Sequence, residues 1–127
     1  MPVSGFVAVG VGAALGAWLR WWLGVAFNTF VPALPLGTLI ANLLGGYLVG
    51  AAVEFSVQHS ALAAELRLFV ITGFLGGLTT FSTFSVEAVA LLSGQQYGWI
   101  AAHVGSHLAG SIVMTVLGIA TVKAFHG

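Results

Sequence analysis

Four apolar segments, each long enough to cross a lipid bilayer, constrain this chain more than any other feature of its sequence. A transmembrane helix needs about 20 predominantly apolar residues, and only short links separate the four segments. Just 5% of the 127 residues are charged and the mean hydropathy is +1.08, whereas a soluble domain carries about 25% charged residues. The sequence therefore predicts an all-α membrane protein, a single transmembrane domain over residues 1–127 with helices at about 3–27, 36–57, 65–92 and 99–124.

The links carry turn signals. Residues 28–35 read NTFVPALP, where two prolines stop helix propagation, and residues 93–98 read SGQQYG. Four crossings place both ends of the chain on the same side of the membrane. The first segment lacks the charged leader region of a signal peptide, so we interpret it as a retained membrane helix.

Orientation in the membrane is weakly specified. Lysine and arginine near helix ends favour the cytoplasmic side, and the chain has only three such residues. Arg67 and Lys123 lie on the side of the termini, whereas Arg20 lies toward the opposite side. Insertion in both orientations would allow an antiparallel homodimer, and a single orientation with the termini inside is the alternative.

Pairs of small residues four apart predict close helix packing in every segment. These pairs are Gly12 with Gly16, Gly46 with Gly50, Gly73 with Gly77, and Gly105 with Ala109. They indicate that helix backbones approach one another, and they carry no information about a substrate.

The third segment is longer than a bilayer requires. Residues 65–92 would form about 42 Å of ideal helix, against a hydrocarbon core of about 30 Å. We expect this helix to break near Gly76–Thr79, which would free backbone carbonyls suited to a small hard cation. The alternative is a straight helix with a glycine packing face.

Hydroxyl and phenyl groups alternate after the expected break. Five of the seven residues in 79–85 are serine or threonine, and Phe81 and Phe84 lie on one helix face. Asn42 in the second segment adds an amide that is costly to bury unpaired. Hydroxyls, amides and the electropositive edges of phenyl rings all suit a small anion. Two alternatives stay open: hydroxyls that bond their own helix carbonyls, and an Asn42 that bonds a neighbouring helix.

Fixed charge is scarce in the segments. Arg20 is the only basic residue of the first segment, where it either concentrates anions at a pore mouth or extends to the headgroups. Glu87 is the only acidic residue deep in the third segment. A cation pathway would be expected to carry intramembrane carboxylates, so the pattern favours an anion without identifying it.

Three stretches resemble the Fluc family of bacterial fluoride channels. They are GAALGAWLRWW (12–22), GTLIANLLGGYLVG (37–50) and GFLGGLTTFSTFS (73–85). The third is the most specific, and the resemblance extends over the whole chain. Trp21 is a small departure, because a tyrosine often follows the arginine in that family.

The resemblance implies a fluoride-selective channel that gives passive efflux across the bacterial inner membrane and lowers cytoplasmic fluoride. It implies an antiparallel, dual-topology homodimer with two pores per dimer, and no organic cofactor. Carbonyls of Gly76 and Thr79 from both subunits would hold a structural Na⁺ at the dimer centre. By similarity, the pore residues are Asn42, Phe81, Phe84, Thr79, Ser82, Thr83, Ser106, Ser111 and Thr115, and Arg20 lies near the vestibule.

Other functions fit less well. A small multidrug transporter needs an acidic residue in its first helix, and the first segment has none. A non-transporting subunit would not explain the hydroxyl–phenylalanine cluster. An enzyme is not expected, because the sequence shows no nucleophile–base pair and no carboxylate pair. Nucleic-acid binding is not expected either, because the net charge is zero and no run of basic residues is present to contact phosphates. His103 and His107 have metal-ligand spacing, but no third ligand follows nearby, so we expect them at a helix interface or the membrane surface.

Overall fold

The computed structural model describes residues 1–126 and places them in four membrane-length helical segments. The first is α1 (Val3–Phe27), the second α2 (Leu36–Gln58) and the fourth α6 (Tyr97–His126). The third spans Ala64–Ser93 and is divided into α3 (Ala64–Arg67), η1 (Leu68–Leu75), α4 (Gly76–Leu78) and α5 (Phe81–Ser93). Residues 1–126 contain no β-strand, so the predicted all-α class with four membrane-length helices is confirmed.

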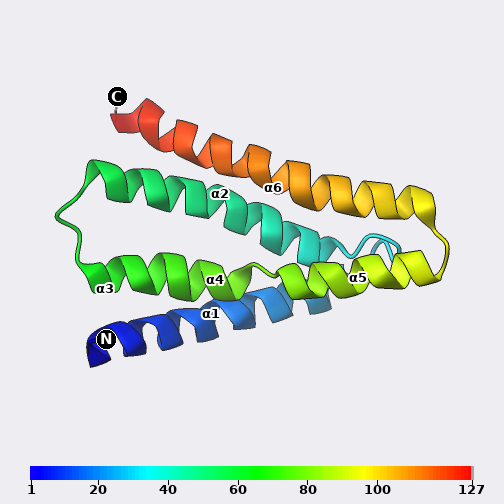
Figure 1. Ribbon diagram of the computed structural model, residues 1–127, viewed down its shortest axis with the longest axis horizontal. Coiled ribbons are helices and arrows are strands. Elements are labelled where there is room, and N and C mark those ends of the chain that lie inside the picture. Colours follow the sequence, from blue (N-terminus) through cyan, green and yellow to red (C-terminus); the bar gives the residue numbers. More distant parts are fainter. Residues whose placement is uncertain (127) are drawn as a thin grey trace.

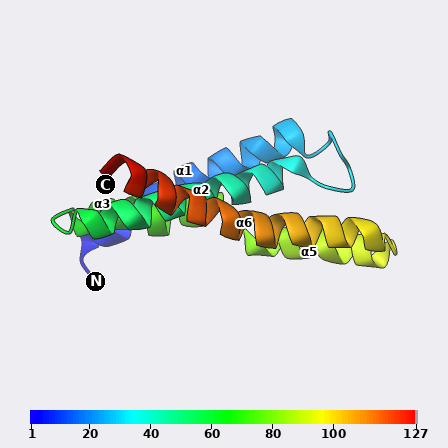
Figure 2. The same cartoon turned by 90° about the horizontal axis from the view of Figure 1, so that it is seen from above.

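The segments run up and down, and both termini lie at the same end of the molecule (Figure 1). The first segment packs on η1 and α4, whereas α2 packs mainly on α6. The Tyr97 end of α6 runs beside α5, away from the ends of α1 and α2 that residues 28–35 connect (Figure 2). The third segment is thereby held between α1 on one side and α2 with α6 on the other.

Glycines make the contact between the first and third segments possible. A Cβ added at Gly16 would overlap the carbonyl oxygen of Phe74, and one added at Gly77 would overlap that of Ala13. Both obstacles are backbone atoms, which cannot rotate away. The glycine pairs of the first three segments therefore act as close-packing surfaces between helices. The prediction for Gly105 with Ala109 is wrong for the single chain, because both residues are exposed and a Cβ added at Gly105 would meet nothing within 4 Å.

The third segment is broken, at a slightly different position from the predicted one. Gly76 is helical, with φ −63° and ψ −37°, and so are the residues up to Leu78. The extended residues are Thr79, with φ −86° and ψ 153°, and Thr80, with φ −150° and ψ 120°. The break lies at Thr79–Thr80, after two glycines that stay helical: Gly77 packs against the backbone of Ala13 in α1, whereas Gly76 is exposed.

A π-helical stretch precedes the break, which the sequence did not predict. The wider turns of η1 cover Leu68–Leu75, directly before the glycines. Its packing partner is α1, which it contacts along much of its length.

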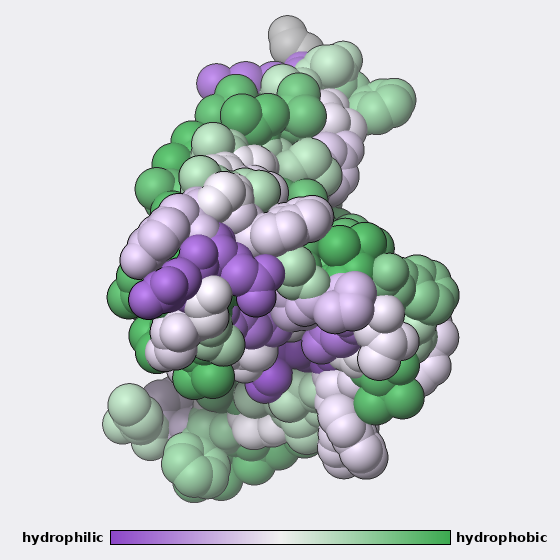
Figure 3. Space-filling view, turned by 90° about the vertical axis from the view of Figure 1, so that its right-hand side faces the viewer, coloured by the Kyte–Doolittle hydropathy of each residue, from purple (hydrophilic) through white to green (hydrophobic). Residues whose placement is uncertain are grey.

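Most apolar side chains face outward. Within residues 1–126 the fully packed apolar core is small, formed by Leu23, Ala41, Leu75, Leu78 and Leu91. Many large apolar groups are exposed in the single chain, among them Phe6 and Trp21. Figure 3 looks at the end that carries residues 28–35 and 94–96: hydrophilic residues gather near its middle, and apolar residues lie on either side. This exterior suits acyl chains, or another apolar protein surface, as its solvent.

Candidate functional site

Asn42 holds the break in the third segment. Its side-chain oxygen accepts a hydrogen bond from the Thr80 backbone N–H at 2.8 Å, and its amide nitrogen donates to the Thr80 carbonyl at 3.0 Å. In a continuous helix the Thr80 N–H would instead bond the carbonyl of Gly76. The asparagine side chain therefore pairs both backbone groups of an extended residue at membrane depth, where unpaired groups are costly. The helix–helix hydrogen bond considered for Asn42 is present.

The hydroxyls after the break cap the next helix. Thr80 is the N-cap of α5, and its Oγ1 accepts a hydrogen bond from the Thr83 N–H at 3.1 Å. The Thr80 hydroxyl also donates to Thr83 Oγ1 at 3.3 Å and lies 3.1 Å from Ser82 Oγ, where either hydroxyl can be the donor. Thr80 thus begins the new helix and joins Ser82 and Thr83 in one polar cluster.

Two hydroxyls bond the carbonyl one turn back, which is the ordinary structural role for such residues. Thr79 Oγ1 donates to the Leu75 carbonyl at 2.8 Å, and Ser85 Oγ donates to that of Phe81 at 2.8 Å. A hydroxyl that donates in this way still offers its oxygen lone pairs, but its proton is engaged.

A groove of about 710 Å³ opens beside the break, between α2, the third segment and α6. We call it the central groove. Six residues predicted from the sequence line it: Asn42, Gly76, Thr79, Phe81, Phe84 and Ser111. Thr80 and His107 also line it. The other lining residues are apolar or glycine, and none of the described lining residues is Lys, Arg, Asp or Glu. The groove is therefore a largely apolar surface with a few neutral hydrogen-bonding groups.

The two phenylalanines differ in their surroundings. Their ring centroids lie 5.5 Å apart with a tilt of 43°. The Phe81 ring is 79% exposed in the single chain. The Phe84 ring is stacked on His103, with centroids 4.9 Å apart and an angle of 14° between planes. Phe84 is thus held by α6, whereas Phe81 extends beyond the packed chain.

The other predicted residues of α6 are divided between the groove and the helix contacts. Ser106 Oγ donates to its own helix, at the His103 carbonyl, 3.1 Å away. Thr115 Oγ1 lies 3.0 Å from the Gly46 carbonyl and 2.9 Å from that of Ser111. Of the three predicted α6 residues, Ser111 is the one that lines the central groove in the single chain.

Arg20 contacts the end of the helix before the break. Its Nε donates a hydrogen bond to the Gly77 carbonyl at 3.0 Å. In an unbroken helix that carbonyl would accept from Phe81, and cations are favoured at helix C-terminal ends. Arg20 is half-buried in this contact, so its side chain does not simply extend to the headgroups. The predicted place near a vestibule is not tested by this contact and stays a prediction.

Comparison with known proteins identifies the family. Residues 7–119 match the family described as CrcB-like protein, Camphor Resistance. The chain belongs to the CrcB-like family. It is 62% identical to a protein of Nitrosospira multiformis over 97% of this chain and 96% of the relative, and 61% identical to one of Cupriavidus taiwanensis over 97% and 98%. A more distant relative from Pseudomonas paraeruginosa is 53% identical over 89% of each chain. All three are named fluoride-specific ion channel FluC, which confirms the resemblance noted in the sequence.

Sequence reasoning missed three polar residues at or near the groove of this CrcB-like chain. Thr80 was counted among the hydroxyls, but nothing in the sequence marked it as the extended residue. His107 lines the groove, and its Nδ1 lies 3.0 Å from Asn42 Nδ2. Glu87 lies beside His103, with Oε1 3.8 Å from His103 Nε2. The spacing of the two histidines signalled a shared helix face, but only the packing of α5 on α6 brings Glu87 to them.

Proposed function

We propose that this CrcB-like protein is a fluoride channel that lets fluoride leave the cytoplasm passively. The observation that carries the proposal is its 62% identity, over nearly the full length of both chains, to a relative named as a fluoride-specific channel. The central groove supports it, because its described lining offers the Ser111 hydroxyl and two phenyl rings and holds no Lys, Arg, Asp or Glu. A first segment without Asp or Glu removes the acidic residue on which the multidrug transporter alternative depends.

The mechanism follows from the chemistry of the groove. Fluoride is small and strongly hydrated, so its water must be replaced in steps as it enters. The Ser111 hydroxyl and the ring edges of Phe81 and Phe84 can face an anion without binding it as tightly as a fixed cation would. Contacts must remain weak enough for the ion to leave, and a narrow path excludes the larger chloride.

We further propose that the working unit is an antiparallel homodimer with two pores. Phe81 is exposed, and the central groove opens at the surface of the single chain, so a second copy is needed to enclose the path. The weak bias of three basic residues is consistent with insertion in both orientations. The bacterial inner membrane is the proposed location.

A structural Na⁺ held by Gly76 and Thr79 is part of the same proposal. Both residues line the central groove. The Gly76 carbonyl has lost its helical partner, because the Thr80 N–H donates to Asn42 instead. Backbone carbonyls are the hard oxygen ligands that such a cation takes. The bound ion would place positive charge beside the anion path.

Efflux from liposomes tests the function. Purified protein is reconstituted with internal fluoride or chloride, and release of each ion is followed with a selective electrode, with protein-free liposomes as the control. We expect rapid fluoride release and chloride release close to the control. Equal release of both ions, or no fluoride release, would refute the channel proposal, and proton-driven uptake of a lipophilic cation would favour the transporter.

A further inference from the structure

Glu87, His103 and His107 form a buried polar cluster where α5 packs on α6. Each side chain offers one metal-binding atom, and these atoms all lie within 4.8 Å of one another. His103 is fully buried and His107 is 4% exposed. The histidines are one helical turn apart, and Glu87 enters from the other helix. The third ligand absent from the nearby sequence is therefore supplied by tertiary packing.

The cluster has an unpaired atom on each of its three members. Glu87 Oε1, His103 Nδ1 and His107 Nε2 are buried and have no hydrogen-bond partner among the described residues. Buried polar atoms are nearly always paired, so an unpaired one requires an explanation. Three such atoms on neighbouring side chains indicate a site that is incomplete without a bound group.

Each of the three side chains is oriented by one hydrogen bond, and those of Glu87 and His103 leave a free lone pair. Thr38 Oγ1 donates to Glu87 Oε2 at 2.8 Å, which leaves Oε1 free. His103 Nε2 lies 3.1 Å from the Phe84 carbonyl, and a carbonyl only accepts, so Nε2 carries the proton and Nδ1 keeps its lone pair. Metal-binding histidines and carboxylates are commonly held by partners of this kind.

We propose that Glu87, His103 and His107 bind a divalent transition metal of the zinc class. Two imidazoles and one carboxylate are a ligand set that zinc takes, with a fourth position left for water or an anion. The side chains must close in by rotation, because zinc ligands lie about 2.0–2.2 Å from the metal. His107 also lines the central groove, which provides the ion with an entry path.

Metal binding is coupled to Asn42 through His107. Asn42 Nδ2 can only donate, so His107 Nδ1 accepts its hydrogen bond and the ring proton is on Nε2. To bind metal through Nε2, the ring must move its proton to Nδ1, and the Asn42–His107 hydrogen bond is then lost. The open coordination position would also hold an anion more tightly than a neutral donor does. Resting on the proposed channel function, we infer that this metal inhibits fluoride flux.

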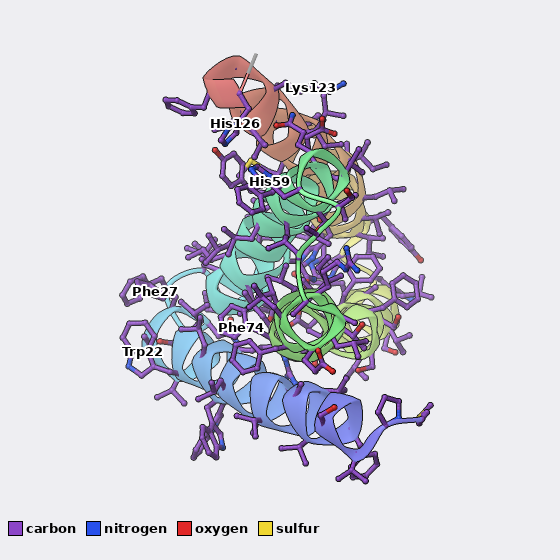
Figure 4. The ribbon with its side chains drawn as sticks, turned by 90° about the vertical axis from the view of Figure 1, so that its left-hand side faces the viewer. Trp22, Phe27, His59, Phe74, Lys123 and His126 are labelled. Atoms are coloured by element: carbon purple, nitrogen blue, oxygen red, sulfur yellow. The ribbon has the colours of Figure 1, made fainter. Side chains whose placement is uncertain are left out.

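Zinc titration of the purified protein tests the site without reference to flux. Binding is measured by calorimetry, and bound zinc is counted by mass spectrometry after gel filtration. We expect Glu87→Gln and His103→Gln each to weaken binding by about 10-fold or more. His59 and His126 supply the matched control, because their rings lie 5.5 Å apart at the end that carries the termini (Figure 4). The cluster lies instead on α5 and the first half of α6, toward the other end of the molecule (Figure 1). The double variant His59→Gln/His126→Gln is expected to bind zinc as the wild type does.

Helical circular dichroism and gel filtration identify any variant that has not folded. For such a variant Thr38→Val is used instead, since it removes only the partner of Glu87 Oε2 and is expected to weaken binding by about 10-fold. Wild-type zinc affinity in the folded cluster variants would overturn the proposal. The proposal would also be overturned if zinc binding were lost in His59→Gln/His126→Gln and kept in the cluster variants.

Fluoride efflux with added zinc tests the coupling. We expect zinc to slow efflux through the wild type and through the His59→Gln/His126→Gln control. Folded Glu87→Gln should resist at least 10-fold more zinc. Zinc binding to wild-type protein that shows no fluoride efflux even without zinc would refute the channel proposal and leave the metal site standing. Normal efflux without cluster-dependent zinc binding would refute the metal site and leave the channel.

Discussion

Replacing Asn42 by alanine should lower the free energy of unfolding more than replacing Asn28, the C-cap residue of α1. The substitution leaves three part-buried groups unpaired: the N–H and carbonyl of Thr80, and Nδ1 of His107. Each unpaired buried group costs about 1–3 kcal/mol. Because the central groove beside Asn42 allows water to re-pair some of them, we expect about 3 kcal/mol in total, the low end of the sum. That corresponds to roughly a 100-fold change in the unfolding equilibrium.

Asn28→Ala is the matched control, since Asn28 makes one comparable hydrogen bond, from the Thr38 N–H at 3.1 Å. It should cost about 1 kcal/mol. Asn42→Asp should cost at least as much as Asn42→Ala, because a carboxylate donates to neither the Thr80 carbonyl nor His107 Nδ1 and places a charge at membrane depth. Equilibrium unfolding in mixed detergent micelles measures all three variants, and fluoride efflux is followed in parallel. If Asn42→Ala were as stable as Asn28→Ala while losing efflux, Asn42 would act as an ion ligand only, and our account of the break would be wrong.

Three further predictions concern packing, the helix end and the groove. Gly16→Ala should lower the free energy of unfolding by about 1–3 kcal/mol, because the added methyl group meets the backbone of Phe74. Gly10→Ala is the control: nothing lies within 4 Å of the added methyl group, so the free energy of unfolding should stay the same or rise by up to about 1 kcal/mol in the same assay. Arg20→Lys keeps the charge but loses the Nε hydrogen bond; we expect it to lower the free energy of unfolding by about 1.5–3 kcal/mol, and wild-type stability would show that the charge alone matters. Phe81→Ile and Phe84→Ile should each reduce fluoride efflux at least 10-fold while circular dichroism remains helical, and normal efflux in both would contradict the role given to the ring edges.

Much of the fold was predictable because a lipid bilayer limits which backbone structures can cross it. Length and apolarity alone define segments that must be helical, since lipid offers no partner for a free backbone group. The break was also foreseeable from the excess length of the third segment and its glycines. Its position was not, because glycine propensity suggested residues 76–79 as the weak point. In the structure both glycines remain helical, Gly77 is needed for contact with α1, and the chain opens at Thr79–Thr80 instead.

The candidate site was predictable only in part, for a related reason. Residues within one helical turn of each other can be paired from spacing, as with Phe81 and Phe84 or His103 and His107. Partners on different helices cannot, because spacing says nothing about which faces meet. Asn42 could equally have donated to an ion or bonded a neighbour, and only the folded chain shows Thr80 and His107 opposite it.

By itself, the amino-acid sequence determined the solvent, the number of crossings, the all-helical class and the family resemblance, since these depend on composition and on local motifs. The tertiary structure alone decided which backbone groups the side chains of Asn42 and Arg20 hold, and that Glu87 joins two histidines from another helix. The physical reason is the distance along the chain over which each property is decided. Hydrophobicity and helix formation are written in neighbouring residues, whereas a polar group buried in a membrane protein is satisfied by whatever distant partner packing brings within about 3 Å.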